Sequence, residues 1–438
     1  MLRVSVQDLS CAPETGYGRR SASEIGWSVF AALYSRLGRR KLKWYMRDVR
    51  GKLLAERLKK RPAQFNSDGG YHIIAAADRI NGLARAYRYE IARLTSASDN
   101  LLACSAEAAS NFLILGHPKD YRRLLASPPK GFLEGYRIGL LVTEFATPPS
   151  DWGFVFDILH EVWTPSTFSA RALRQVTDLP VKVVPHAVEI PDVPPMKRSK
   201  FGIGDGQFLG MAIMDLSSCP ERKNPLAHVR AWKLAFGNDC NAHLLMKVRY
   251  SKNTAFMRQE LAKEIAGAEN ISVTEAVFSD LDMTAFQKMT DIYLSLHRAE
   301  GYGLNIHEML EIGKAVITTA WSGNMDYVPF YPNAVPVPFE LVPYRDSTYH
   351  FCREGLFWAE PDVEVAASAL QDARRRWEEV GGSSRRGFVT GSDSGGHDCS
   401  GPHTNAHLPA CSPDGIFGHH APSQACQGPD AAGNALGH

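Results

Sequence analysis

Short apolar runs alternate with longer amphipathic segments from Tyr71 to about residue 380. Continuous apolar runs are typical of strands buried on both faces of a parallel sheet, and the segments between them carry the 3.6-residue period of helices. We expect strands over 71–77, 100–105, 111–116, 136–145, 160–166, 181–188, 208–216, 243–250, 271–278, 291–296, 315–320 and 334–339, with a further one possible at 3–8. We expect helices over 21–38, 83–94, 151–160, 167–175, 224–236, 254–267, 282–290, 304–312 and 361–380.

Strands that alternate with helices predict an α/β fold with parallel sheets. Residues 188–206 are rich in proline, glycine and charge, which indicates a linker between two Rossmann-like domains. The expected division is an uncertain N-terminal region, a first domain, the linker, a second domain and a tail, with bounds 1–69, 70–188, 189–206, 207–381 and 382–438.

The two ends of the chain differ from the rest. Residues 39–61 hold eleven Lys or Arg against Asp48 and Glu56, which fits a basic helix lying on an anionic membrane surface or, alternatively, a solvated basic helix. The tail 382–438 is dominated by Gly, Ser, Pro, His and Ala, a composition that predicts disorder. Its His and Cys residues lack Cys-x2-Cys spacing, so we expect no structured zinc site there.

Composition narrows the class of protein. The chain of 438 residues is 44% hydrophobic and 22% charged, as soluble globular proteins are, and its net charge is +2. No apolar run reaches the ~18 residues of a membrane-spanning helix, and the first residues lack the layout of a secretory signal. A cytoplasmic location, with peripheral attachment to the inner membrane face through residues 39–61, is therefore expected. The near-neutral chain lacks the features of a nucleic-acid binder.

Residues 291–320 combine a buried strand, a glycine-rich turn at 300–305, a helix and a second strand. This βαβ unit places free backbone N–H groups and the positive end of a helix dipole at the turn, which favours an anion such as phosphate. Two carboxylates, Glu300 and Glu308, flank the turn. They predict a nucleotide-type ligand, with its phosphate on the turn and its hydroxyls on the acids.

The segment EGYGLNIHE, preceded by SLHR and followed by GKAVITTAWSGN, resembles the donor-site segment of retaining glycosyltransferases with the GT-B fold, of the group 1 (family 4) kind. The stretches DILHEVWTPSTFSARAL, VKVVPHAV and ERKNP are similar to the same family. The resemblance implies two Rossmann-like domains facing a central cleft, the first on the acceptor side and the second binding the nucleotide sugar. It implies transfer of a sugar from a nucleotide-diphosphate sugar to a polysaccharide or lipid-linked glycan acceptor.

The resemblance also implies roles for individual residues. Lys223 and Lys247 would bind the diphosphate, Glu300 would lie by the transferred sugar, and Glu308 would hold the ribose hydroxyls. The relatives' Arg a few residues before Lys223 is replaced here by Ser217 and Ser218, so Arg222 either substitutes for it or that contact is missing. The donor set is completed by the turn residues Gly301, Tyr302, Gly303, Leu304 and Asn305. No cofactor is implied beyond the sugar donor, no metal is expected, and retention would follow from front-face attack.

Three residues are candidates for the acceptor side of the cleft: His117, Glu144 and His186. Each histidine could equally be a hydrogen-bonded structural residue, and Glu144 is proposed only because it ends a predicted strand. His297 is expected to pack behind Glu300 and orient it, and Ser322 to cap a short helix. Two alternatives stay open for the whole protein: a nucleotide-sugar epimerase of the same architecture, and a non-catalytic sugar-nucleotide-binding protein.

Overall fold

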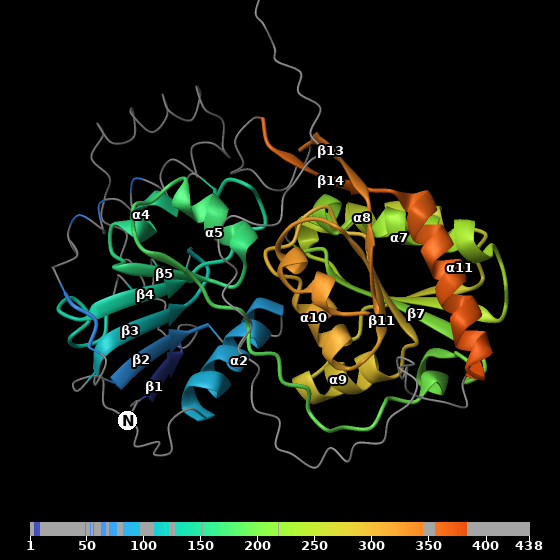
Figure 1. Ribbon diagram of the computed structural model, residues 1–438, viewed down its shortest axis with the longest axis horizontal. Helices are drawn as coiled ribbons and strands as arrows, with labels where there is room; N and C mark the ends of the chain where they lie inside the picture. The colour runs from blue at the N-terminus through green and yellow to red at the C-terminus, as the bar shows by residue number, and fades with distance from the viewer. Residues whose placement is uncertain are drawn as a thin grey trace, which may run out of the picture. The chain divides into compact units, whose positions relative to one another are not determined.

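The computed structural model contains two parallel β-sheets and a separate β-hairpin (Figure 1). It describes residues 4–8, 63–66, 70–76, 82–96, 109–118, 128–149, 152–217, 219–344 and 355–382, with Val49, Leu53, Glu56, Asp120, Tyr121 and Leu124. The predicted α/β class with two parallel sheets is confirmed. The predicted helix at 21–38, the basic run, the strand at 100–105 and the tail lie almost wholly outside these residues. No helix in the described ranges is long and apolar enough to cross a membrane.

The first sheet has its described strands in chain order, each parallel to the next. The strands are β1 (Val4–Asp8), β2 (Gly70–Ala75), β3 (Ala109–Leu115), β4 (Tyr136–Leu140), β5 (Glu161–Thr164) and β6 (Val181–Val183). The associated helices are α2 (Gly82–Ser96), α4 (Gly153–Phe156) and α5 (Thr167–Arg174). Because β1 pairs along its length with β2, the sheet includes residues 4–8 and starts well before the boundary expected at residue 70.

The second sheet has the order β12-β11-β10-β7-β8-β9. Its strands are β7 (Phe208–Asp215), β8 (Ala242–Arg249), β9 (Ile271–Thr274), β10 (Ile292–Ser295), β11 (Ala315–Thr319) and β12 (Ala334–Val337). The principal helices are α6 (Pro220–Lys223), α7 (Pro225–Phe236), α8 (Phe256–Ile265), α9 (Asp280–Lys288), α10 (Leu304–Glu311) and α11 (Val363–Glu379). The order reverses between β7 and β10, which is the doubly wound arrangement that binds ligands outside the carboxyl ends of the two strands at the reversal.

Both faces of the second sheet are buried, as the continuous apolar runs predict. Phe208, Ala212 and Met214 of β7 pack with α7 and α11, while Leu209 and Met211 face the core formed with α9 and α10. Figure 1 shows α7 and α11 side by side along this sheet. Alternate residues of one strand therefore serve two cores, which explains why β7 has no polar face.

Several predicted elements are shorter than expected. The strands predicted over 181–188 and 271–278 end at Val183 and Thr274. The strand predicted over 136–145 ends at Leu140, and the helix predicted over 151–160 is helical only over 153–156. The apolar residues beyond Leu140 are nonetheless buried, because the loop after β4 packs on other parts of the chain; Phe145, for example, joins a small cluster with Cys219 and Trp358. Apolar burial by a loop gives the same sequence pattern as a strand.

An antiparallel hairpin was not predicted. It pairs β13 (Phe339–Pro343) with β14 (Phe357–Pro361), and it follows the expected strand at 334–339, whose last residue belongs to β13. Its strands begin or end next to prolines, which weakens a strand pattern in the sequence. Glu360 of β14 accepts hydrogen bonds from Arg298 and Asn224, so the hairpin contacts the loops that carry the candidate site.

Candidate functional site

A hollow of about 540 Å³ lies at the carboxyl ends of β7 and β10, where the strand order of the second sheet reverses. We call it the carboxyl-edge hollow. Its volume is within the range of ordinary small-molecule sites. The residues predicted for the site that line it are Arg222, Lys223, Glu300, Gly301, Tyr302, Gly303, Leu304, Asn305, His117, Glu144 and His186. Two predicted residues, Lys247 and Glu308, are not part of its lining.

The glycine-rich turn forms one wall of this hollow. Gly303 has φ of 85°, which a residue with a side chain rarely adopts, and it directly precedes the first residue of α10. The hydroxyl of Tyr327 donates to the carbonyls of Tyr302 and Gly303 at 2.9 and 2.8 Å, which fixes the turn from behind. Leu304, Asn305 and Ile306, the first residues of α10, line the hollow, so the positive end of the helix dipole lies at this wall.

The loop that contains Ser322 and Gly323 fixes the position of the glycine-rich turn. A β-carbon at Gly323 would meet the carbonyl oxygen of Gly301 at 2.1 Å, so only glycine fits this approach. Ser322, at φ of 78°, accepts a hydrogen bond at 2.8 Å from the backbone N–H of Glu300. Ser322 makes no side-chain cap to the short helix that follows, so its predicted capping role is wrong. It fixes the backbone of Glu300 instead.

Two cations and two acids meet at the floor of the hollow. The ammonium of Lys223 pairs with Glu300, and the guanidinium of Arg222 lies 3.3 Å from Glu300 and 3.5 Å from Glu144. Arg222 is only 5% exposed and also donates at 2.9 Å to the carbonyl of Ala299. The segment that carries Arg222 and Lys223, called the cationic loop below, thus contacts Glu300 through both side chains.

Arg298 holds the cationic loop. It donates to the carbonyl of Glu221 at 2.6 Å and to the carboxylate of Glu360 in β14, and its backbone N–H donates to the carbonyl of Arg222 at 2.8 Å. The unpredicted hairpin therefore supports α6 from behind. This support is not visible in sequence, because Arg298 and Glu360 are far apart along the chain.

The charges around Glu300 decide its protonation. Burial by itself would raise the pKa of Glu300, but Lys223 and Arg222 outweigh it and lower that pKa to about 2. The carboxylate is therefore ionised at neutral pH, although its side chain is only 14% exposed. An ionised Glu300 keeps Lys223 oriented in the hollow until an anionic ligand competes for it.

We expect this carboxylate to make stability depend on pH in a defined window. The folded-state pKa of about 2 lies below the ordinary value of 4.5, so the contribution is complete above pH 4.5 and is lost as pH falls toward 2. The loss should be about 3 kcal/mol in the free energy of unfolding. Urea unfolding of the wild type and Glu300→Gln at several pH values measures it. The stability gap between the two proteins should shrink through this window; a constant gap would contradict the assignment.

Lys247 lies inside β8, opposite Ile213 of β7 and Thr274 of β9. Its ammonium lies 5.7 Å from the ring centre of Phe278, and burial lowers its pKa. The neighbouring carboxylate of Asp215, which does line the hollow, acts in the opposite direction on that pKa. Lys247 is thus one strand removed from the cations on α6.

Glu308 is completely buried, and its carboxylate contacts α2 rather than the hollow. It lies 2.9 Å from the guanidinium of Arg85 and accepts hydrogen bonds from Tyr89 at 3.1 Å and Gln287 at 2.7 Å. Burial raises the pKa of Glu308, and Arg85 acts against this rise. The ribose role implied for Glu308 would therefore require exchange of these partners.

The hollow also contains residues that the sequence did not single out. His228 is 2% exposed; its Nε2 accepts from the N–H of Leu296 at 2.9 Å, and its Nδ1 lies 2.9 Å from the carbonyl of Asn224. Burial lowers the pKa of His228 to about 4, so the ring is neutral and joins α7 to the end of β10. Asp215, the last residue of β7, also lines the hollow, and its place at a strand end was the available signal.

His297 does pack close to Glu300, as predicted, although its hydrogen bonds go elsewhere. Its two ring nitrogens lie 3.1 Å from the hydroxyl of Ser295 and 3.2 Å from the carbonyl of Trp321. Burial lowers the pKa of His297, and the charge of Glu300 works against that change. Among the described contacts His297 makes no hydrogen bond to Glu300, so the predicted orientation of that carboxylate by His297 stays a prediction.

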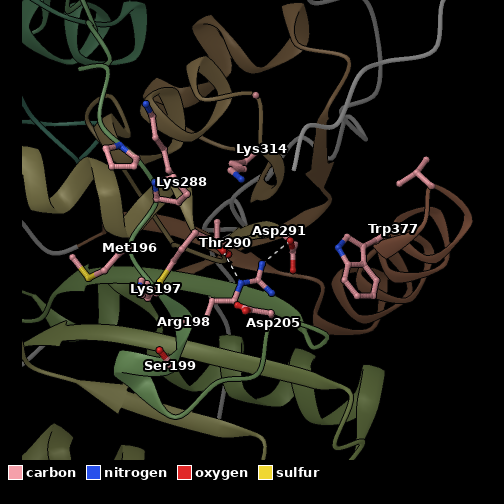
Figure 2. A pocket seen from close by; sticks show the side chains of 15 residues that line it. Met196, Lys197, Arg198, Ser199, Asp205, Lys288, Thr290, Asp291, Lys314 and Trp377 are labelled. Atoms are coloured by element: carbon pink, nitrogen blue, oxygen red, sulfur yellow. Dashed lines mark hydrogen bonds and ion pairs between the residues drawn. The ribbon is translucent and has the colours of Figure 1, made fainter. Parts of the chain in front are cut away.

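A second hollow, of about 440 Å³, lies at the opposite edge of the second sheet (Figure 2). Its lining includes Thr290, Asp291 and Lys314, which directly precede β10 and β11. The guanidinium of Arg198 donates to the carboxylate of Asp291 at 2.8 Å and to the carbonyls of Met289 and Gln207 at 3.0 and 2.7 Å. These hydrogen bonds join the linker to the second sheet. We therefore assign this hollow a structural role, as the junction between the linker and that sheet.

Among the described residues, no three His, Cys, Asp or Glu side chains are grouped so as to hold a metal ion. The prediction that no metal takes part stays a prediction, since substrates can bring a metal with them.

Comparison with known proteins gives matches among solved structures alone. No family model and no curated protein sequence matches the chain. TarM of S. aureus, in a complex that includes UDP, is 11% identical at a TM-score of 0.40, covering 62% of this chain and 52% of that one. The pneumococcal O-GlcNAc transferase GtfA with UDP and GlcNAc is 12% identical at a TM-score of 0.40, covering 63% and 51%. This chain thus spans about half the length of these two.

A third match is a trehalose-6-phosphate protein from E. coli bound with UDP-2-fluoro glucose, which is 11% identical at a TM-score of 0.45. The match covers 85% of this chain and 91% of that chain. At such TM-scores the function of this protein has to be judged from its own hollow.

Proposed function

We propose that this protein is a retaining, metal-independent glycosyltransferase that moves a sugar from a nucleotide-diphosphate sugar to a polysaccharide or lipid-linked glycan acceptor. The observation that carries the proposal is the meeting of Arg222 and Lys223 with the glycine-rich turn at the reversal point of a doubly wound sheet. Such a site offers two cations and helix N–H groups to one dianionic leaving group.

The proposed reaction uses these groups on the leaving diphosphate. As the bond between the sugar C1 and the phosphate oxygen breaks, negative charge grows on that oxygen. Lys223 and Arg222 neutralise it, and the N–H groups at the start of α10 bind a neighbouring phosphate. The acceptor oxygen forms its bond to C1 on the same face, and its proton passes to the departing phosphate oxygen. Retention of configuration follows from that same-face attack.

Glu300 has two tasks in this scheme. In the absence of ligand its carboxylate pairs with Lys223 and lies near Arg222, which keeps both cations at the floor of the hollow. When the diphosphate takes over those cations, the carboxylate becomes available to accept hydrogen bonds from hydroxyls of the transferred sugar. Glu144, whose carboxylate lies 3.5 Å from Arg222, is our candidate for a side chain that contacts the acceptor.

Nucleotide binding tests the proposal most directly. A ligand that binds only the folded protein raises its melting temperature by mass action, so UDP or GDP at 100 times its Kd should add about 2.7 kcal/mol of stability. The measurement is a thermal-shift series with UDP, GDP and the corresponding monophosphates, run with EDTA to test metal independence. A melting temperature unchanged by every diphosphate would overturn the proposal. Product analysis without an acceptor then separates a transferase from an epimerase.

A further inference from the structure

A buried carboxylate on α2 faces a buried histidine of the carboxyl-edge hollow. Glu90 is 1% exposed and His186 is 5% exposed. Oε1 of Glu90 lies 3.5 Å from Nδ1 of His186, and neither atom has a hydrogen-bond partner among the described residues. Buried polar atoms in native proteins nearly always have a hydrogen-bond partner. This pair therefore indicates a hydrogen bond that shortens when ligand is bound.

The other oxygen of Glu90 is already engaged. Oε2 accepts from Nε and Nη2 of Arg93 at 3.0 and 2.8 Å. This pairing balances the charge of the carboxylate, so Glu90 can hold the imidazole of His186 without requiring a protonated ring. A neutral imidazole whose Nδ1 carries the proton has Nε2 as a hydrogen-bond acceptor.

His186 is placed to reach a ligand. It follows β6, lines the hollow, and its ring packs edge to face on the ring of Tyr302 in the glycine-rich turn, with 4.8 Å between centres. The hydroxyl of Tyr302 lies 3.4 Å from the carbonyl oxygen of His186 and 2.8 Å from Nδ1 of His307. The backbone and ring of His186 are thus fixed against the wall that is proposed to bind phosphate.

We propose that Glu90 is a positioning residue that keeps His186 in the Nδ1–H tautomer, so that Nε2 accepts a hydrogen bond from a hydroxyl of the sugar substrate in the hollow. This inference rests on the proposed glycosyl transfer for the identity of the hydroxyl. The assignment of the tautomer rests only on the contacts that Glu90 makes with His186 and Arg93. Glu90 acts through His186 and does not touch the substrate.

The first test measures the tautomer by ¹⁵N NMR of the histidine side chains, with the His186 signals identified by their absence in His186→Gln. We expect the proton on Nδ1 in the wild type. In Glu90→Gln, Arg93 retains the amide oxygen, which turns the NH₂ group toward His186 and moves the ring proton to Nε2. Arg88→Gln is the control, since it removes another α2 contact, the pair with Asp280, and should leave the tautomer unchanged.

The second test measures kinetics with the donor and acceptor on which the wild type is active. Glu90→Gln and His186→Asn should lower kcat at least tenfold, with the Kd for UDP or GDP changed less than twofold. His186→Gln should restore most of kcat, because its amide oxygen reaches the position of Nε2 while that of asparagine does not. Melting temperatures show that each variant is folded.

An Nε2–H ring in the wild type, or a Glu90→Gln variant with unchanged tautomer and kcat, would overturn the inference. Failure of the wild type to bind any nucleotide diphosphate would instead remove the proposed function. In that case the NMR result still decides whether Glu90 sets the tautomer of His186.

Discussion

A Lys223→Ala variant is expected to lose affinity for UDP or GDP by about 10- to 150-fold, which corresponds to the ~1.5–3 kcal/mol of a charge-assisted hydrogen bond. Transfer should fall further, by about 10²–10³-fold, because the charge on the leaving phosphate is largest in the transition state. Isothermal titration with the nucleotide and initial rates with the donor sugar measure the two effects. The fold should survive, since the side chain of Lys223 is 18% exposed and Glu300 retains Arg222.

Lys247→Ala is the matched control for this experiment. Lys247 is also a lysine, and it lies on β8, the neighbour of the strand β7 that precedes α6. Its ammonium, however, lies over Phe278 and outside the carboxyl-edge hollow. We expect its nucleotide affinity to change less than about tenfold, below the value of one direct charged contact. Equal losses in the two variants would contradict the division of roles and would return Lys247 to the diphosphate site that the resemblance implies.

Glu308→Ala is expected to destabilise the protein by about 3–5 kcal/mol. The substitution leaves Arg85, which is 6% exposed, without its carboxylate, and it removes the acceptor of Tyr89 and Gln287. Arg85 would retain only the neutral hydroxyls of Thr284 and Tyr89 as hydrogen-bond acceptors, at 2.9 and 3.3 Å. Urea unfolding followed by fluorescence measures the loss.

A double variant separates the buried pair from simple loss of packing. Arg85→Met with Glu308→Leu removes both charges and keeps most of the volume, so it should recover much of the stability that Glu308→Ala loses. A single-variant loss below about 1 kcal/mol would mean that Arg85 finds water or another partner. Comparing unfolding with and without UDP then shows whether Glu308 also contributes to the ligand site.

The sequence predicts the local unit of the site well. The strand, glycine-rich turn, helix and strand between residues 291 and 320 are present, because each is determined by neighbouring residues: Gly303 needs its left-handed φ, and the apolar period of α10 fits the core below it. The sequence also assigns the cations of α6 and Glu300 to one site, and in the structure these side chains lie together at the hollow. Their positions follow from strand ends at the reversal of the sheet, which is a topological rule.

Contacts between distant segments could not be predicted in the same way. The helix position of Glu308 allows it to face either the hollow or α2, and only the fold brings Arg85 to it across more than 200 residues. Arg298 and Glu360 are a similar case, in which an unpredicted hairpin supports the cationic loop. Lys247 lies within β8, which runs on to Arg249, and the diphosphate role that the resemblance implies for it stays a prediction.

The tight fit of the glycine-rich turn has a consequence for how related sequences should vary. A β-carbon at Gly301 would meet the side chain of Val142 at 2.3 Å and the carbonyl of Thr143 at 3.1 Å, and one at Gly323 would meet the carbonyl of Gly301. Selection on this region therefore acts on the absence of a side chain at Gly301 and Gly323 as well as on the charged residues. In homologous chains that have lost the chemistry, the acids and lysines are free to drift, while these two glycines should persist as long as the fold does. Glycines kept without Lys223 and Glu300 would identify an inactive descendant.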